Sequence, residues 1–209
     1  MNQDKLKTAE RKFLTKYPLG FQSPEMLEIV KKHKMEKYIE FAKTSFAKEN
    51  LKQPKQVTQA MVKMITQSSM VSVFEKPKFR DFVASLSAAE NERLGAALME
   101  FLHGDEKSGF ENQIQILTKG QLAKWSIITV CPSYFEPNKE VFIKPTTAKG
   151  VIEHFEITKI KYNPKPTYEF YKEYRAIINS MKKKVNKSLS PSNAAFGGFL
   201  MMSLGLYNK

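Results

Sequence analysis

Apolar residues recur at helical spacing along most of this chain, and the pattern is clearest between residues 168 and 185. Large apolar side chains there fall within one narrow arc of a helical projection; they are Phe170, Tyr171, Tyr174, Ile177, Ile178, Met181 and Val185. Thr167 stands at the expected N-cap, and lysines 182–184 complement the negative end of the helix dipole. The sequence therefore predicts a long amphipathic helix here, in a chain that is mainly helical.

Helices are also predicted in the first part of the chain, over residues 4–17, 24–47 and 55–71 and over a segment that starts at Ser87. Ser87 and Glu90 have the spacing of a capping box, in which each side chain bonds the other's backbone N–H. The apolar arc of residues 24–47 changes sides near Lys34, so we expect a bend there or contacts on both faces. Residues 1–118 are predicted to form an irregular helical bundle.

Composition changes after Gly120. Two short β-branched runs bounded by prolines, Trp125–Cys131 and Glu140–Ile143, have the pattern of paired strands, and residues 160–162 could add a third. We therefore expect a mainly α protein of the α+β class, with a small antiparallel sheet packed against helices. The boundaries are 1–118 for the bundle portion and 119–209 for the basic α+β portion, and both could belong to one continuous domain.

The net charge of +13 arises from 34 Lys and Arg against 21 Asp and Glu. Residues 1–118 hold 19 basic and 15 acidic residues, net +4, whereas residues 119–209 hold 15 and 6, net +9. Such a charge attracts polyanions, either nucleic acid or an anionic membrane surface. All but four of the basic residues are lysine, which suits phosphate contact better than base recognition. A merely solvated basic surface explains the composition equally well.

Cysteine and histidine are too few and too scattered for a zinc site. Cys131 is the single cysteine, so we expect no disulfide-linked partner and a reducing, cytoplasmic location. The longest apolar run, 194–206, is interrupted by glycines and is shorter than the ~20 residues of a membrane span. No cofactor and no metal are expected from these residue types.

One segment, Phe142–Gly150, has the composition of an anion-binding turn. It places Lys144, Thr146, Thr147 and Lys149 where a strand would enter a helix, and free backbone N–H groups, hydroxyls and positive charge suit phosphate. The segment lacks the glycine spacing of a P-loop, so nucleotide hydrolysis is not implied. The alternative is that Thr146 or Thr147 caps the helix and both lysines are solvated.

Aromatic residues alternate with lysines in the second half, a mixture that holds single-stranded nucleic acid by stacking and phosphate contact. The candidate residues for this role are Lys124, Trp125, Lys161, Tyr162, Lys165, Lys172 and Arg175. The alternative is that most of these rings belong to the core. Hydrolytic chemistry has little support, since His33, His103 and His154 lie far apart and no nucleophile motif surrounds Cys131.

A further pattern comprises Trp125–Thr129, Val141–Thr146, Lys149, residues 162–166, Tyr168 and Tyr171. This pattern resembles a family of uncharacterised bacterial proteins to which no activity is attached. The resemblance covers about fifty residues of the second half and implies a bacterial cytosolic protein.

These observations favour a non-enzymatic protein that binds a polyanion, most plausibly nucleic acid, without strong sequence preference. Two alternatives stay open: a phosphodiester-cleaving or nucleotide-handling enzyme whose carboxylates converge only in the fold, and a protein-interaction module. Three acidic groups in a cleft beside Lys144 or Lys149 would favour the enzyme.

Overall fold

The computed structural model describes residues 1–206. Within that range all regular secondary structure is helical, with eleven α-helices and three 3-10 helices. The α-helices are α1 (Gln3–Lys16), α2 (Pro24–His33), α3 (Met35–Ser45), α4 (Pro54–Gln67), α5 (Glu75–Ser85), α6 (Ala88–His103), α7 (Glu106–Thr118), α8 (Trp125–Phe135), α9 (Pro145–His154), α10 (Tyr168–Lys182) and α11 (Asn193–Ser203). The 3-10 helices are η1 (Gly20–Gln22), η2 (Lys48–Lys52) and η3 (Lys187–Leu189). The expected antiparallel sheet is wrong, because residues 1–206 contain no strand.

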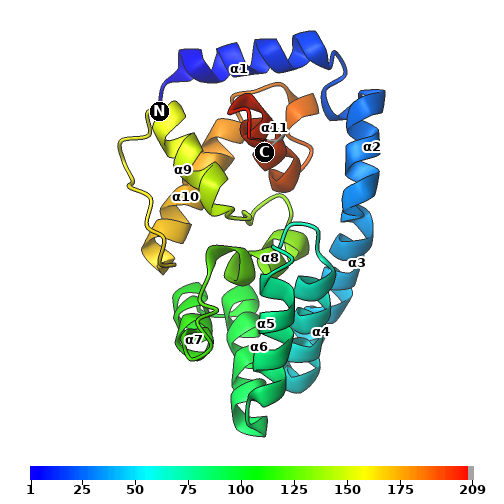
Figure 1. The fold of residues 1–209 in the computed structure, drawn as a ribbon, viewed down its shortest axis with the longest axis vertical. Coiled ribbons are helices and arrows are strands. Elements are labelled where there is room, and N and C mark those ends of the chain that lie inside the picture. Colours follow the sequence, from blue (N-terminus) through cyan, green and yellow to red (C-terminus); the bar gives the residue numbers. More distant parts are fainter. Residues whose placement is uncertain (207–209) are drawn as a thin grey trace.

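The helices form two groups that share one hydrophobic core (Figure 1). Helices α3 to α8 make a lower bundle, and α9, α10 and α11 make an upper group with α1 lying across its top. α2 continues into α3 along one side of the molecule, and α10 also contacts α7 of the bundle. The boundary expected at residue 118 stays a prediction, although α1 contacts α11 and both α3 and α4 contact α8 across it.

Several local signals in the sequence are confirmed. The bend expected in the second helical segment is a break at Lys34, whose φ of 49° lies in the left-handed region and separates α2 from α3. Ser87 and Glu90 form the capping box at the start of α6. Thr167 caps α10 by accepting a hydrogen bond from the Phe170 backbone N–H. The last helix begins at Asn193 with Ser192 as its N-cap.

The segment Trp125–Cys131 was expected to be a strand and is instead the helix α8. Every residue from Trp125 to Tyr134 is buried, so an apolar β-branched run marks a helix surrounded by other helices on all sides. A helix satisfies its backbone groups internally, which a lone strand in a helical core could not do. Pro132 lies inside the helix.

The other two expected strands are extended connections without a ladder partner in the described chain. Residues 140–144 lead into α9, and the Ile143 backbone N–H is bonded at 3.0 Å to the Thr129 hydroxyl of α8 instead of to another strand. Residues 160–162 lie in the connection between α9 and α10. The Thr129 hydroxyl thus takes the place of a partner strand as the acceptor for the Ile143 N–H.

A buried ion-pair network joins the two helix groups. One guanidinium nitrogen of Arg175 on α10 lies 2.6 and 2.8 Å from the two carboxylate oxygens of Glu140, and the other lies 2.6 Å from Glu106 of α7. Lys139 reaches the same two carboxylates at 3.3 and 3.2 Å. The Tyr171 hydroxyl also donates to Glu140, whose side chain is 2% exposed. The network therefore fixes segment 136–140 against both α7 and α10.

The pKa values of the network show that its charges stabilise one another. Burial alone raises the pKa of Glu106, but Arg175 and then Lys139 lower it more, so the net pKa lies below the ordinary 4.5. Burial alone lowers the pKa of Lys139, but Glu140 and Glu136 raise it by more, so the net pKa is raised to about 12. Burial raises the pKa of Tyr171 well above its ordinary value, and the neighbouring Glu140 adds to this. Glu106 and Lys139 therefore stay ionised near neutral pH, and the Tyr171 hydroxyl stays protonated.

Removal of the Arg175 side chain should destabilise the fold strongly, because it leaves the buried Glu140 carboxylate without its main partner. Arg175→Ala is expected to lower the free energy of unfolding by about 3 kcal/mol or more, measured by urea denaturation. Arg80→Ala is the matched control, since Arg80 pairs with Asp81 at an exposed site and its loss should cost no more than about 1 kcal/mol. Equal losses in the two variants would contradict a structural role for the network.

Candidate functional site

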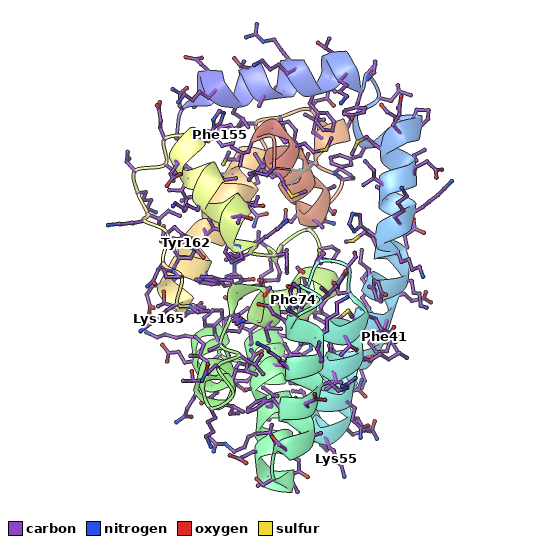
Figure 2. The ribbon with its side chains drawn as sticks, in the orientation of Figure 1. Phe41, Lys55, Phe74, Phe155, Tyr162 and Lys165 are labelled. Atoms are coloured by element: carbon purple, nitrogen blue, oxygen red, sulfur yellow. The ribbon has the colours of Figure 1, made fainter. Side chains whose placement is uncertain are left out.

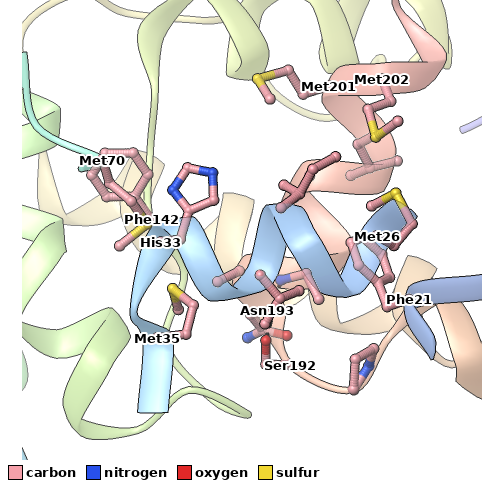
Figure 3. Close-up of a pocket in the computed structure, with 18 of the residues that line it drawn as sticks. Phe21, Met26, His33, Met35, Met70, Phe142, Ser192, Asn193, Met201 and Met202 are labelled. Atoms are coloured by element: carbon pink, nitrogen blue, oxygen red, sulfur yellow. Dashed lines mark hydrogen bonds between the residues drawn. The ribbon is translucent and has the colours of Figure 1, made fainter. Parts of the chain in front are cut away.

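A cavity of about 590 Å³ lies between α2 on one side and α11 on the other (Figure 3). Residues Met26 and His33 of α2, Met201 and Met202 of α11, and Phe142 of the segment before α9 surround it. Tyr174 and Ile178 of α10 also line it. Segments from both ends and the middle of the chain thus build one apolar space.

The wall formed by α2 is the apolar face of this helix, the face that an amphipathic helix normally packs against the core. Met26 is the only fully buried residue of α2, while Ile29, Val30 and His33 on the same face are half-buried and line the cavity. The helix begins with Pro24 at its first position and ends at the left-handed Lys34. α2 therefore presents its apolar face to an open space and not to tightly packed side chains.

The opposite wall is formed by small residues on α11. Ala194, Ala195, Gly197 and Gly198 line the cavity, where larger side chains would fill it. A Cβ added at Gly197 would meet no atom within 4 Å. Helix-interior glycines are unfavourable by roughly 1 kcal/mol relative to alanine. The space beside Gly197 is therefore maintained at a cost in helix stability.

Five of the ten methionines in the sequence line this cavity. They come from four different segments and are Met26, Met35, Met70, Met201 and Met202. Methionine is flexible and polarisable, and it adapts to apolar surfaces of different shapes. The wall is thus suited to an apolar ligand and can adjust to its outline.

Two oxygens in the cavity wall find no hydrogen-bond partner within the described protein. They are Oγ1 of Thr147, a residue 9% exposed, and Oδ1 of Asn193, a residue 4% exposed. The amide nitrogen of Asn193 is engaged, donating to the Glu140 carbonyl at 3.0 Å and to Asn179 at 3.1 Å. An unsatisfied buried polar group typically costs about 1–3 kcal/mol. Both oxygens are enclosed by neighbouring atoms of the wall, so neither is accessible to a ligand without a side-chain rotation.

Charged side chains line the cavity with an excess of positive charge. Lys144 and Lys187 contribute two ammonium groups and Glu36 one carboxylate, and all three residues are exposed. The Lys144 ammonium lies 3.9 Å from the Met201 sulfur, which places it against α11. The exposed edge of the cavity therefore favours an acidic group over a basic one.

His33 is the titratable group on the α2 wall. Its Nδ1 lies 2.7 Å from the Ser69 hydroxyl, in the loop that follows α4. Partial burial lowers the pKa of His33 below 6.5, so the ring is neutral at physiological pH. The bond to Ser69 connects α2 to the lower bundle.

The four residues predicted to bind an anion lie on two sides of α9. Lys144 and Thr147 line the cavity, whereas Thr146 and Lys149 border a shallow depression with His154 and Leu206. Neither threonine caps the helix, because Lys144 occupies the N-cap and Pro145 the first position. Lys149 lies 3.9 Å from Glu153. The structure thus brings Lys144 and Thr147 together at one cavity and leaves Thr146 and Lys149 outside it.

Two of the residues predicted to bind nucleic acid serve the interior instead. Trp125 is 1% exposed, packs its ring against Phe110 and Phe170, and donates its indole N–H to the Asn163 carbonyl. Its ring offers no free face to a base. Arg175 is held by Glu106 and Glu140 in the network described above.

The remaining candidates are nearer the surface. Lys161, Lys165 and Lys172 are exposed. Tyr162 is half-buried and makes an edge-on contact with Phe170; Figure 2 labels Tyr162 and Lys165. Lys124 is paired with Glu75 at 3.3 Å. Their role in nucleic-acid binding stays a prediction.

Other chemistry has little support in the described part of the chain. Residues 1–206 contain no group of three His, Cys, Asp or Glu side chains that could hold a metal ion. Burial raises the pKa of the Cys131 thiol well above its ordinary value, which makes it a poor nucleophile. No helix within residues 1–206 combines the length and the apolar character that crossing a membrane requires.

Sequence reasoning missed the cavity. Met26, Ile29, Val30 and His33 lie on one side of the predicted helix, but the interrupted apolar run 194–206 carried no sign of a cavity wall. The meeting of these two segments depends on tertiary structure, because about 160 residues separate the two helices in the chain.

Comparisons with known proteins identify no relative of this chain. No protein-family model, no curated protein and no solved structure matches the chain. The likeness of residues 125–171 to uncharacterised bacterial proteins stays a prediction.

The lowered pKa of His33 makes the stability of the protein depend on pH. Because the pKa in the folded state lies below 6.5, protonation favours the unfolded state, so the contribution of His33 to stability is full above pH 6.5 and falls as the pH decreases below it. Between about pH 7.5 and pH 5, the protein should lose more stability than its His33→Gln variant, measured by urea unfolding at each pH. Parallel stability curves for the two proteins would contradict this.

Proposed function

We propose that the protein binds an apolar ligand that carries an acidic group at one end, such as a medium- or long-chain fatty acid, in the cavity between α2 and α11. The cavity volume of about 590 Å³ is the observation that carries this proposal, because it falls within the range of roughly 300–1,000 Å³ typical of small-molecule sites. Methionine, phenylalanine and aliphatic side chains supply most of its wall.

The apolar walls favour a ligand over a space filled with water. Burial of apolar surface contributes about 25 cal/mol per Å², so a hydrocarbon chain against these walls would be stabilised by several kcal/mol. The half-buried face of α2 would then become fully packed on binding.

The polar groups support an acidic end group. Lys144 and Lys187 can pair with a carboxylate at the exposed edge, where Glu36 contributes the one opposing charge. The unpaired oxygens of Thr147 and Asn193 are enclosed in the wall and would need a side-chain rotation to reach the ligand. Of the four residues predicted to bind an anion, this proposal uses the charge of Lys144.

The arrangement supports binding more than catalysis. The bond between Ser69 and His33 resembles a nucleophile beside a base. Within residues 1–206 the other ring nitrogen of His33 donates no hydrogen bond to a carboxylate, however. Ser69 also follows the C-terminal end of α4, where the helix dipole disfavours a developing oxyanion. Hydrolysis would need both features.

A second candidate function is binding of a polyanion through the lysine-rich surface. The net charge of +13 favours it, and Lys161, Lys165 and Lys172 are exposed in the more basic half. The burial of Trp125 and the pairing of Arg175 remove one of the two stacking rings and the arginine from this interpretation, whereas Tyr162 remains.

A substitution that fills the cavity should abolish ligand binding without harming the fold. Gly197→Leu places a branched side chain where an added Cβ meets no atom, and it also raises helix propensity, so the melting temperature should stay the same or rise. The affinity for dodecanoate, measured by calorimetry, should fall at least about tenfold. Ala84→Leu is the control, because it adds the same side chain to an exposed position of α5. Unchanged affinity in a folded Gly197→Leu variant would refute the cavity as the site.

The acidic end group is tested by comparing two lysines on the same segment. Lys144→Ala should weaken dodecanoate binding about two- to fivefold, the magnitude of an exposed ion pair, whereas Lys149→Ala, outside the cavity, should leave it unchanged. Neither variant should alter the affinity for dodecanol, which has the same chain without the charge. Equal effects of the two substitutions would show that Lys144 does not contact the end group.

A further inference from the structure

The loop that follows α4 supplies Ser69 and Met70 to the cavity and also carries the two most exposed large apolar side chains of the described chain. Val73 is 68% exposed and Phe74 is 77% exposed. Figure 2 shows Phe74 at the upper end of the lower bundle, where α5 begins. The two residues lie next to each other at the tip of the loop.

The base of this loop is anchored, so the exposure of the tip is built into the fold. The hydroxyl of Ser68 is within hydrogen-bond distance of the Tyr134 hydroxyl, 3.0 Å, and accepts a bond from the Met70 backbone N–H at 3.1 Å. Val71 is buried in the core. The anchored loop therefore keeps the side chains of Val73 and Phe74 exposed to solvent. Exposure of two adjacent large apolar side chains is unfavourable unless a partner covers them.

Basic residues follow the tip in the sequence. Lys76, Lys78 and Arg80 follow within the first two turns of α5, and among residues 1–206 neither Lys76 nor Lys78 takes part in an ion pair. The nearest carboxylates are already engaged, Glu75 with Lys124 and Ser126, and Asp81 with Arg80. The complementary surface is therefore anionic, with an apolar layer that can receive a valine and a phenylalanine.

We propose that the Val73-Phe74 tip inserts into the interfacial region of an anionic lipid membrane, with the basic residues at the start of α5 close to the headgroups and the adjoining cavity positioned to exchange its ligand with the bilayer. Interfacial anchoring combines inserted apolar residues with basic residues near acidic lipids. A tip of two residues is too small for a stable protein interface, which buries about 800 Å² on each partner. The exchange of ligand rests on the proposed function, whereas the membrane contact does not.

The experiment is co-sedimentation of the full chain with phosphatidylcholine vesicles that contain about a third phosphatidylglycerol. The protein should bind these vesicles, bind pure phosphatidylcholine weakly, and be released by high salt. The double variant Val73→Ser with Phe74→Ser should reduce the partition coefficient at least about tenfold. Leu51→Ser is the control, because Leu51 is an exposed leucine of η2, close in sequence to Lys55 at the lower end of the bundle.

A second measurement reports insertion directly. Phe74→Trp places an indole at the tip, and its emission should shift to shorter wavelength when anionic vesicles are added, while Trp125 is already buried and should not respond. Melting curves establish that each variant is folded, which is expected because the substituted side chains lie in water.

Three outcomes would overturn the proposal. These are equal vesicle binding by the protein and the double tip variant, no spectral shift with Phe74→Trp, and binding of single-stranded DNA without binding of vesicles. The last outcome would favour the polyanion function instead. Vesicle binding retained by Gly197→Leu would support the tip independently of the cavity, so failure of the ligand proposal and failure of the membrane proposal can be told apart.

Discussion

The ion pairs of Arg175 are the interaction on which the other features of the fold depend. They join α10 to α7 of the lower bundle and hold Glu140, whose backbone carbonyl accepts the hydrogen bond of Asn193 at the start of α11. The next residues after Glu140 are Val141 and Phe142 in the cavity wall. A buried ion pair is not in itself a strong source of stability, but removing one partner is costly, so this network specifies how the two helix groups meet.

The cavity follows from the choice of residues on two helices that meet above this junction. α2 brings an apolar face with a single fully buried residue, and α11 brings alanines and glycines where larger side chains would close the space. Protein interiors are normally packed to high density, so an apolar space of this size is an exception that reduces stability. The proposed ligand binding would explain such an arrangement, and the neighbouring Val73-Phe74 tip is the proposed route from a membrane.

The sequence predicted local features well and tertiary ones poorly. Caps and breaks at Ser87, Thr167 and Lys34 depend on a few adjacent residues and could be found from spacing alone. The run Trp125–Cys131 was misassigned because a helix buried on every side and a strand buried on both faces have the same apolar composition. Lys144 and Thr147 were predicted as site residues from their residue types. Their separation from Thr146 and Lys149 depends on the rotation of α9, and the cavity depends on contacts between distant segments.

The methionines allow the most direct test of ligand binding, because five of the ten line the cavity and the other five do not. The measurement is a titration of the protein, labelled with carbon-13 at its methionine methyl groups, with dodecanoate under observation by NMR. The account predicts saturable shifts for Met26, Met35, Met70, Met201 and Met202, with the methyl groups of Met61, Met64 and Met99 in the lower bundle nearly unchanged. Shifts confined to the second set, or no saturable shift at all, would contradict it.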